Sequence, residues 1–291
     1  MSDTITISTG GRTRARRVFS SPPLAVLFAW GYALVSALPL LWLLMQSFRP
    51  GVQVLSNPWG LPLRPTVEGY VEAFRTTPLA QYFVNSLIVT LCVVLVSVAA
   101  CAGAGYAFSR LRFPGSHYVF AVFIGVLVVP APVLLLPVYL ISGNLGILDS
   151  HLGLIAPYAA GILPIGSYLM KTHFDSLPDS YAEAAEIDRA TPWQIFHTIM
   201  FPLIRPAAAT VAVLAFMTAW NEYVYAVVAI HSQSLFTLPV GVADLSSKAF
   251  LHGYGPVLAA MVLTSIPVYV AFLLAQRSFL ASFSLGGGVK G

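Results

Sequence analysis

The most unusual ionisable residue in the sequence is Glu222, because it lies inside a long apolar run, Pro206–Ile230. A charged side chain at the centre of a membrane-spanning helix costs about 3 kcal/mol on insertion scales unless it faces a cavity or a partner. The same segment holds the amide of Asn221 and the rings of Trp220 and Tyr225. Two interpretations stay open: these four residues line a translocation pathway, or the carboxylate makes a hydrogen bond to a helix of a partner membrane subunit.

A second set of ionisable residues crowds into residues 179–188 of one polar segment, and this stretch carries four of the eleven acidic residues: Asp179, Glu183, Glu186 and Asp188. Pro178 before Asp179 suits the first turn of a helix, where a missing N–H costs nothing and a negative charge meets the helix dipole. Thr191-Pro-Trp-Gln194 predicts the start of a second helix, with Thr as N-cap and Gln in a capping box. The segment therefore predicts a helix–turn–helix outside the bilayer, in which small Ala184 and Ala185 allow close approach. By composition alone this hairpin either couples to another protein or lies on the membrane surface.

Motifs of the common catalytic and nucleotide-binding sites are missing from the sequence. No lysine follows a glycine, so the phosphate-cradling motif Gly-x-x-x-x-Gly-Lys-Ser/Thr is absent. The six histidines form no His-Glu-x-x-His pair, and there is no Gly-x-Ser-x-Gly nucleophile elbow. We therefore expect no catalytic residue, no metal site and no cofactor in this chain, and any ATP-driven work requires a separate subunit.

The composition is that of a membrane protein. Of 291 residues, 57% are hydrophobic and 9% charged, and the mean hydropathy is +0.80. The 15 Lys and Arg and 11 Asp and Glu residues compare with roughly 73 charged residues in an average protein of this length. This shortage excludes a soluble enzyme, a disordered chain and a nucleic-acid binder, despite a pI near 9.1.

Six apolar runs are long enough to cross the hydrocarbon core of a bilayer, which takes about 20 helical residues. They are continuously apolar, whereas the strands of a membrane β-barrel alternate over about ten residues. The expected fold is an all-α integral membrane protein with six transmembrane helices. Prolines within the runs indicate either a bundle that encloses a pathway or ordinary tolerance of proline in membrane helices. The predicted spans lie near Pro23–Ser47, Tyr82–Phe108, Tyr118–Ile141, Leu152–Met170, Pro206–Ile230 and Tyr254–Gln276.

The positions of the basic residues predict the orientation and the domain boundaries. Eleven of the fifteen Lys and Arg residues lie on the side of the two termini, so both termini are expected in the cytoplasm. The first apolar run exceeds the about 7–15 residues of a signal-peptide core and is expected to stay as an anchor. We expect a basic arm at 1–22 that contacts anionic lipid, a transmembrane domain at 23–278 with its polar segment at 173–203, and a cytoplasmic tail at 279–291.

The longest external loop, Phe48–Gln81, carries an apolar stripe with helical spacing at Val67, Tyr70, Val71 and Phe74. The stripe predicts a short amphipathic helix that lies on the membrane or on a partner.

The polar segment resembles the EAA loop of membrane subunits in bacterial binding-protein-dependent ABC importers, whose pattern runs Glu-Ala-Ala, three residues, Gly, and a proline-rich end. The matching residues are Glu183, Ala184, Ala185, Asp188, Ala190, Phe196, Pro202 and Pro206. Other stretches match the carbohydrate-uptake branch of these importers: Asn85-Ser86, Arg110–Gly115, Leu145-Gly146, Trp220-Asn221-Glu222 and Gly288–Gly291. The similarity runs from about Pro23 to the C-terminus, and the chain resembles the smaller, six-span permease subunit of maltose-type transporters.

The resemblance implies a multi-pass subunit of the bacterial inner membrane that forms a heterodimer with a second permease. Two ATPase subunits, which would hold ATP and Mg²⁺, and an extracytoplasmic solute-binding protein would complete the importer. The solute would be a sugar or oligosaccharide, with a sugar phosphate left open. The helix–turn–helix would dock in a groove of the ATPase, with Tyr181 and Ile187 as apolar anchors. The coupling residues implied in this way are Tyr181, Glu183, Ala184, Ala185, Ile187, Asp188, Arg189 and Ala190.

One residue departs from the family pattern, because Arg189 stands where the family usually has Gly. Gly suits a left-handed residue at the end of a helix, and Arg costs about 1 kcal/mol in that conformation. Either Arg189 adopts the left-handed conformation or the turn is made differently, and its guanidinium is available to pair with an acidic group of a partner.

Another class of function remains as the alternative. A self-contained secondary transporter would be driven by protons carried on Glu222. An integral membrane enzyme is disfavoured because no catalytic constellation is present in the sequence.

Overall fold

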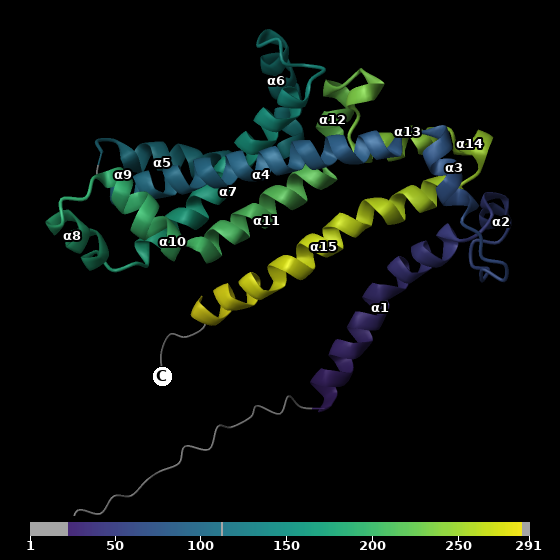
Figure 1. Ribbon diagram of the computed structural model, residues 1–291, viewed down its shortest axis with the longest axis horizontal. Coiled ribbons are helices and arrows are strands. Elements are labelled where there is room, and N and C mark those ends of the chain that lie inside the picture. Colours follow the sequence, from purple (N-terminus) through teal and green to yellow (C-terminus); the bar gives the residue numbers. More distant parts are fainter. Residues whose placement is uncertain (1–22, 112, 287–291) are drawn as a thin grey trace, which may run out of the picture. The chain divides into compact units, whose positions relative to one another are not determined.

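A computed structural model describes residues 23–111 and 113–286, and every regular element in these ranges is a helix (Figure 1). The chain divides into residues 1–43 and 44–291, and each unit is described by itself. The first apolar run forms the helix α1 (Pro23–Ser47), with the bounds that the sequence predicts. The expected N-terminal arm and the last five residues of the expected tail lie outside the described residues.

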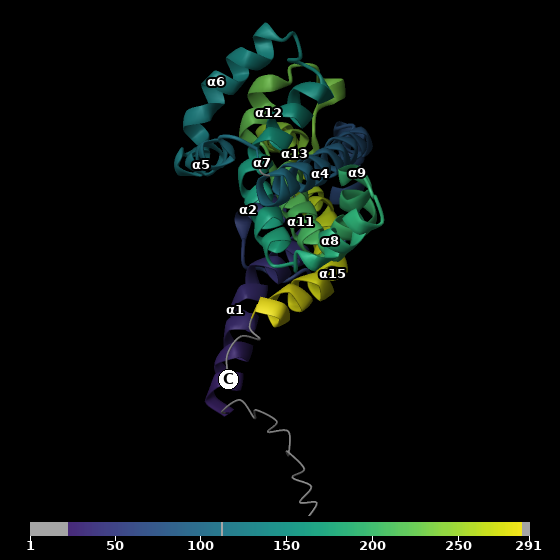
Figure 2. The same ribbon diagram turned by 90° about the vertical axis from the view of Figure 1, so that its left-hand side faces the viewer.

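Three long helices form the core of the second unit: α4 (Leu79–Arg110), α7 (His151–Asp175) and α11 (Arg205–Asn221). Helices α4 and α7 lie side by side along their lengths, and α11 packs against both (Figures 1 and 2). A fourth long helix, α15 (Gly255–Gly286), packs on α11 and continues past the domain boundary expected at residue 278.

Glycines set how closely these helices approach. A Cβ atom built on Gly105 of α4 would lie 2.5 Å from the Cβ of Met170 in α7. A Cβ built on Gly166 of α7 would lie 2.4 Å from the Sγ of Cys101 in α4. Small residues at such contacts let membrane helices pack closely, which matters because lipid supplies no hydrophobic drive for helices to associate.

The third apolar run forms a bent pair of helices instead of a straight span. Helix α5 (Ser116–Gly125) continues into the 3₁₀ turn η1 (Val126–Val128), and α6 (Ala131–Asn144) leaves this direction at 111°. Pro130 lies at the break, where proline disfavours the helical region for the residue before it. The prediction of one continuous helix over Tyr118–Ile141 is therefore wrong.

The fifth apolar run is also interrupted. Helix α11 ends at Asn221, and a short helix α12 (Val224–Ala229) begins after a break at Glu222 and Tyr223. The prediction of one helix over Pro206–Ile230 is therefore wrong beyond Asn221, and the acidic residue lies in the break. Before α11, and bent by 78° from it, the chain forms α9 (Pro192–Gln194), the π-helical turn η2 (Ile195–Met200) and α10 (Phe201–Leu203).

The six predicted spans are thus borne out only in part. Among the described residues, four helices are long and apolar enough to cross a membrane, and the number rises to six if each bent pair counts as one span.

Short helices gather at the end of the second unit that lies away from α9 (Figure 1). They are α2 (Gly51–Ser56), α3 (Glu68–Thr76), η3 (Gln233–Leu235), α13 (Leu238–Ser247) and α14 (Ala249–His252). The stretch Asn85-Ser86 connects α4 to this region through hydrogen bonds. The side-chain amide of Asn85 donates to the carbonyl of Ser234 at 2.9 Å, and Ser86 Oγ accepts the backbone amide of Leu238 at 2.7 Å.

Helix α3 confirms the predicted short helix of the long loop. It packs on α15 through Gly69 and Ala73, which are buried. The apolar stripe stays exposed at Val67, Val71 and Phe74. A Cβ atom built on Gly69 would lie 2.9 Å from the backbone of Gly255 in α15, so the missing side chain allows the two helices to approach at this point.

Candidate functional site

The polar segment after α7 forms the helix α8 (Ser180–Ile187) and a tight left-handed turn. Arg189 has a φ of 57°, in the left-handed region. Its amide donates to the carbonyl of Glu186 at 2.9 Å, and the amide of Ala190 donates to the carbonyl of Ala185 at 3.0 Å. These two bonds make a Schellman motif, whose left-handed position is usually Gly. Arg189 therefore makes the turn that Gly makes elsewhere, at a cost of about 1 kcal/mol.

The predicted start of the second helix is confirmed at Thr191. Its amide donates to Oε1 of Gln194 at 2.7 Å, and the amide of Gln194 donates to Oγ1 of Thr191 at 3.3 Å. Pro192 occupies the first turn, where its missing N–H is not needed. The two arms of the helix–turn–helix are thus defined by local capping.

Helix α8 presents apolar and acidic side chains on its outer side. Ile187 is 83% exposed and Tyr181 is 47% exposed, so both present apolar surface on the outer side of α8. Ala185 is buried and Ala190 packs on the core, so these two residues contact their own chain. The other exposed members of the expected coupling set are Glu183, Ala184, Asp188 and Arg189.

Three aromatic rings from three elements hold this segment against the long helices. The ring of Tyr106 in α4 lies 5.5 Å from that of Phe174 in α7 and 5.0 Å from that of Phe196 in η2, between centroids. Such pairs add about 1 kcal/mol beyond the area that they bury. Of the three residues, only Phe196 was indicated by the sequence.

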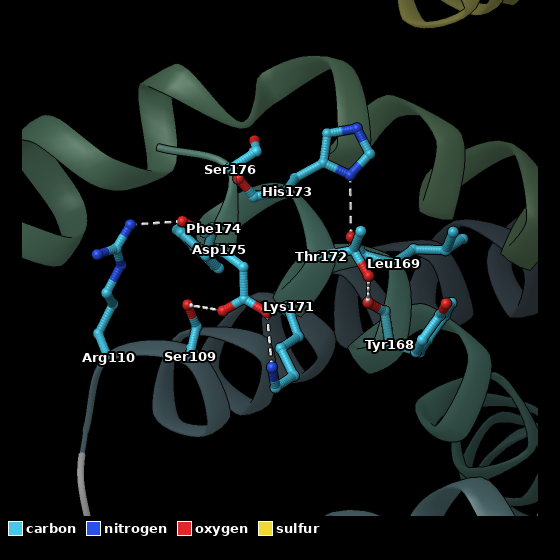
Figure 3. A network of polar contacts seen from close by, with 10 residues as sticks. All are labelled: Ser109, Arg110, Tyr168, Leu169, Lys171, Thr172, His173, Phe174, Asp175 and Ser176. Atoms are coloured by element: carbon cyan, nitrogen blue, oxygen red, sulfur yellow. Dashed lines mark hydrogen bonds and ion pairs between the residues drawn. The ribbon is translucent and has the colours of Figure 1, made fainter. Parts of the chain in front are cut away.

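A polar network at the adjoining ends of α4 and α7 completes this region (Figure 3). Ser109 Oγ donates to Oδ1 of Asp175, and Lys171 Nζ donates to Oδ2 of the same carboxylate, both at 2.6 Å. The guanidinium of Arg110 donates to the carbonyl of Phe174 at 2.5 Å. The sequence indicates no role for Arg110 beyond its place in the stretch Arg110–Gly115, although a basic residue in the last turn of a helix is a recognisable signal.

The carboxylate of Glu222 caps the short helix α12. Its Oε1 accepts the amide of Tyr225 at 2.8 Å, and its Oε2 accepts the amide of Ala226 at 3.0 Å. The hydroxyl of Tyr158 in α7 donates to the same Oε2 at 2.5 Å. The first amides of a helix have no intrahelical acceptor and favour a nearby negative charge, so the acid stabilises the break in which it lies. Within this chain Glu222 therefore caps α12 and joins it to α7, while the expected hydrogen bond to a partner subunit stays a prediction.

The same short helix is tied to α6 and to the turn before α7. Tyr225 shares a hydrogen bond of 2.8 Å with Ser142 of α6, and both residues are buried. Asp149 accepts the amides of His231 and Ser232 at 2.9 and 2.8 Å and the Ser232 hydroxyl at 2.6 Å. The Ser232 hydroxyl first, and then the two amides, lower the pKa of Asp149 to about 2. The sequence did not indicate Asp149 or Tyr158, because their partners are distant along the chain.

The four residues that were expected to line a pathway do not form one continuous surface: Trp220, Asn221, Glu222 and Tyr225. Trp220 is fully buried, donates from Nε1 to the carbonyl of Thr264 at 3.1 Å and stacks on Phe216. Its ring therefore cannot cover the face of a solute in this conformation, which corrects the expectation for this residue. Asn221 is exposed and donates to the carbonyl of Met217 at 2.8 Å. Glu222 and Tyr225 remain together at the start of α12.

A sequence family described as binding-protein-dependent transport system inner membrane component matches residues 15–282. The diacetylchitobiose uptake system permease protein NgcG of Streptomyces coelicolor is 32% identical, over 93% of this chain and 89% of that protein. The galactooligosaccharides transport system permease protein GanQ of Bacillus subtilis is 33% identical, over 88% of this chain and 91% of that protein. The inner membrane ABC transporter permease protein YcjP of Escherichia coli is 35% identical, over 89% of this chain and 93% of that protein.

The fold has a counterpart among solved structures. A chain of a bacterial ABC transporter involved in the import of the acidic polysaccharide alginate superposes with a TM-score of 0.75 at 24% identity, over 87% of this chain and 94% of that chain. The two chains therefore share one fold.

Proposed function

We propose, from the premise that this chain belongs to the family of binding-protein-dependent transport system inner membrane components, that it helps to carry a sugar or oligosaccharide across the bacterial inner membrane. The chain is a permease subunit of an ABC importer, and its multi-pass helical fold agrees with that role. The sugar class rests on the relatives, whose names specify diacetylchitobiose and galactooligosaccharides.

The observation that carries the coupling part of the proposal is the exposed helix α8 beside the ends of α4 and α7. Tyr181 and Ile187 present apolar surface that a groove on an ATPase subunit would bury. Glu183 and Asp188 lie on the exposed side, where they would meet basic groups of that subunit. Ala185 is buried, so its small size serves packing within this chain.

The remaining partners follow from the same proposal. A second permease subunit would complete the pathway, two ATPase subunits would bind ATP and Mg²⁺, and an extracytoplasmic binding protein would deliver the solute. Both termini and α8 would lie on the cytoplasmic side, as the distribution of basic residues predicts. In this chain the break at Glu222 would border the pathway, with Asn221 exposed beside it.

The proton-driven alternative receives no support from the site. Both oxygens of the Glu222 carboxylate accept hydrogen bonds, three in all, from two backbone amides of α12 and from the Tyr158 hydroxyl. These contacts give the carboxylate the role of a helix cap.

Uptake by the importer reconstituted with its partners in vesicles tests the proposal, with a panel of diacetylchitobiose, galactooligosaccharides and trehalose as probes. The double variant Tyr181→Ser with Ile187→Ser should abolish ATP-driven uptake and ATPase binding, while membrane insertion is retained. Leu63→Ser, a matched change of an exposed apolar residue outside α8, should leave uptake unchanged. Full uptake by the double variant, or uptake in ATP-depleted vesicles under an imposed pH gradient, would refute the proposal.

A further inference from the structure

Arg110 joins three elements at the point where the chain passes from α7 to α8. Its Nη2 donates to the carbonyls of Phe174 at 2.5 Å and Leu177 at 2.6 Å, and its Nη1 pairs with the carboxylate of Asp179. The Arg110 side chain is 14% exposed, whereas that of Asp179 is 73% exposed. One largely enclosed guanidinium therefore binds the end of α4 to the end of α7 and to the residue before α8; Figure 3 shows its contact with Phe174.

The chemistry of this contact is specific to arginine. The last carbonyls of a helix have no intrahelical donor, and a cation beside them also meets the negative end of the helix dipole. The rigid fork of a guanidinium reaches two carbonyls and a carboxylate at once, while a lysine presents a single point charge. Ser109, the preceding residue, holds Asp175 in addition. Two successive residues of α4 thus bind the last turn of α7.

The link between α7 and α8 is short, because it consists only of residues 176–179. Two residues of this link, Leu177 and Asp179, are the ones that Arg110 contacts. A link held in this way resists bending, so a displacement of α8 would pass to α4 and α7.

We propose that Arg110 is a positioning residue that transmits the motion of α8 to the α4–α7 pair during transport. This role rests on the proposed function, in which α8 docks on an ATPase subunit. Arg110 itself touches neither the solute nor the nucleotide.

The test uses the whole importer in vesicles, with the sugar panel named above. Two quantities are measured on assembled complexes: the stimulation of ATPase by loaded binding protein, and the sugar moved per ATP hydrolysed. Arg110→Gln should lower the sugar moved per ATP about tenfold, as expected for losing a set of hydrogen bonds to a charged group. Asp179→Asn keeps both carbonyl contacts and should lower it about threefold. Arg110→Lys keeps the charge but not the fork-shaped guanidinium. Its sugar moved per ATP should lie between that of these two variants and that of the parent.

Arg205→Gln is the matched control, because Arg205 is an exposed arginine at the start of α11. It should leave both quantities unchanged. A purely structural role of Arg110 would reduce the amount of assembled complex but leave the sugar moved per ATP at the parent value, and this result overturns the proposal. If the Arg110→Gln complex does not assemble, Arg110→Lys and Asp179→Asn test the proposal instead. If both variants move as much sugar per ATP as the parent, the proposal is overturned. Uptake that survives the Tyr181 and Ile187 changes refutes the docking role of α8 instead, so the two failures are distinguishable.

Discussion

At the level of single residues, Arg189 occupies a backbone conformation that its side chain disfavours. Its φ of 57° closes the Schellman motif after α8, where glycine carries no Cβ penalty. Arg189→Gly should therefore stabilise the turn by about 1 kcal/mol, and amide exchange across Ser180–Ile187 should slow about fivefold. Hydrogen exchange of the purified chain in detergent measures this effect.

Two further substitutions separate the backbone effect from the charge. Arg189→Lys keeps the charge and the Cβ atom, so exchange should stay at the parent rate. Arg189→Val adds branching at Cβ and should speed exchange, because β-branched residues are outliers at positive φ. Faster exchange in Arg189→Gly would show that the guanidinium, and not the backbone, controls the stability of this turn.

Glu222 is the other residue whose role depends on backbone partners. Glu222→Ala removes the acceptor of two amides and of the Tyr158 hydroxyl, so the free energy of unfolding should fall by about 2 kcal/mol. Glu222→Gln keeps one acceptor oxygen and should lose about half as much. Asn221→Ala, a change of the exposed neighbour, should stay within about 0.5 kcal/mol of the parent. Denaturant titration in mixed micelles compares the unfolding free energies of the three variants. If Glu222→Gln loses uptake but keeps the stability of the parent, the result would favour Glu222 as a proton carrier.

At the level of the helices, the crossing of α4 and α7 depends on the missing side chain of Gly105. A Cβ there would lie 2.5 Å from the Cβ of Met170 and 2.9 Å from the backbone nitrogen of Lys171, so Gly105→Ala should lower the unfolding free energy by about 1–3 kcal/mol. Gly103 is the matched control on the same helix, since a Cβ there meets nothing within 4 Å. Gly103→Ala should be neutral or gain up to about 1 kcal/mol from helix propensity. Equal thermal unfolding of the two variants would show that the helices can separate without cost.

The breaks in the apolar runs also belong to the helical level, and they have two different causes. Pro130 and Pro206 interrupt or start helices for covalent reasons that are visible in the sequence. The break at Glu222 has no proline, and it exists because a carboxylate replaces the intrahelical acceptors at the start of α12. A proline break could therefore be anticipated along the chain, while the capped break required the folded geometry.

Over the whole molecule, Asp149 ties the turn before α7 to a segment more than eighty residues later. Its pKa falls from the ordinary 3.8 to about 2, first through the Ser232 hydroxyl and then through two backbone amides. Because the pKa is depressed in the folded state, this stabilisation is complete above the unfolded value and is lost as the pH falls from about 4 to 2. Asp149→Asn should therefore be less stable than the parent at pH 6, and this difference in stability should disappear towards pH 2. Thermal unfolding of both proteins at a series of pH values measures this difference. A difference that stays constant with pH would show that the charge of Asp149 does not contribute to stability.

The sequence by itself determined the features that depend on neighbours along the chain. The shortage of charge predicts a membrane protein, since lipid-facing positions exclude charged groups. The capping box at Thr191 and the amphipathic α3 follow from spacing alone, because their hydrogen bonds and faces are set within a few residues. The motifs around Glu183 likewise predicted the family.

Only the tertiary structure decided which distant groups meet. Tyr158 and Glu222 lie 64 residues apart, and Arg110 and Asp179 lie 69 apart, so no local pattern connects them. The same folding buried Trp220 against α15, which removed it from the expected pathway wall. The physical reason is that an enclosed polar group must find its partner in whichever segment packs beside it, and packing is determined by shape across the whole chain.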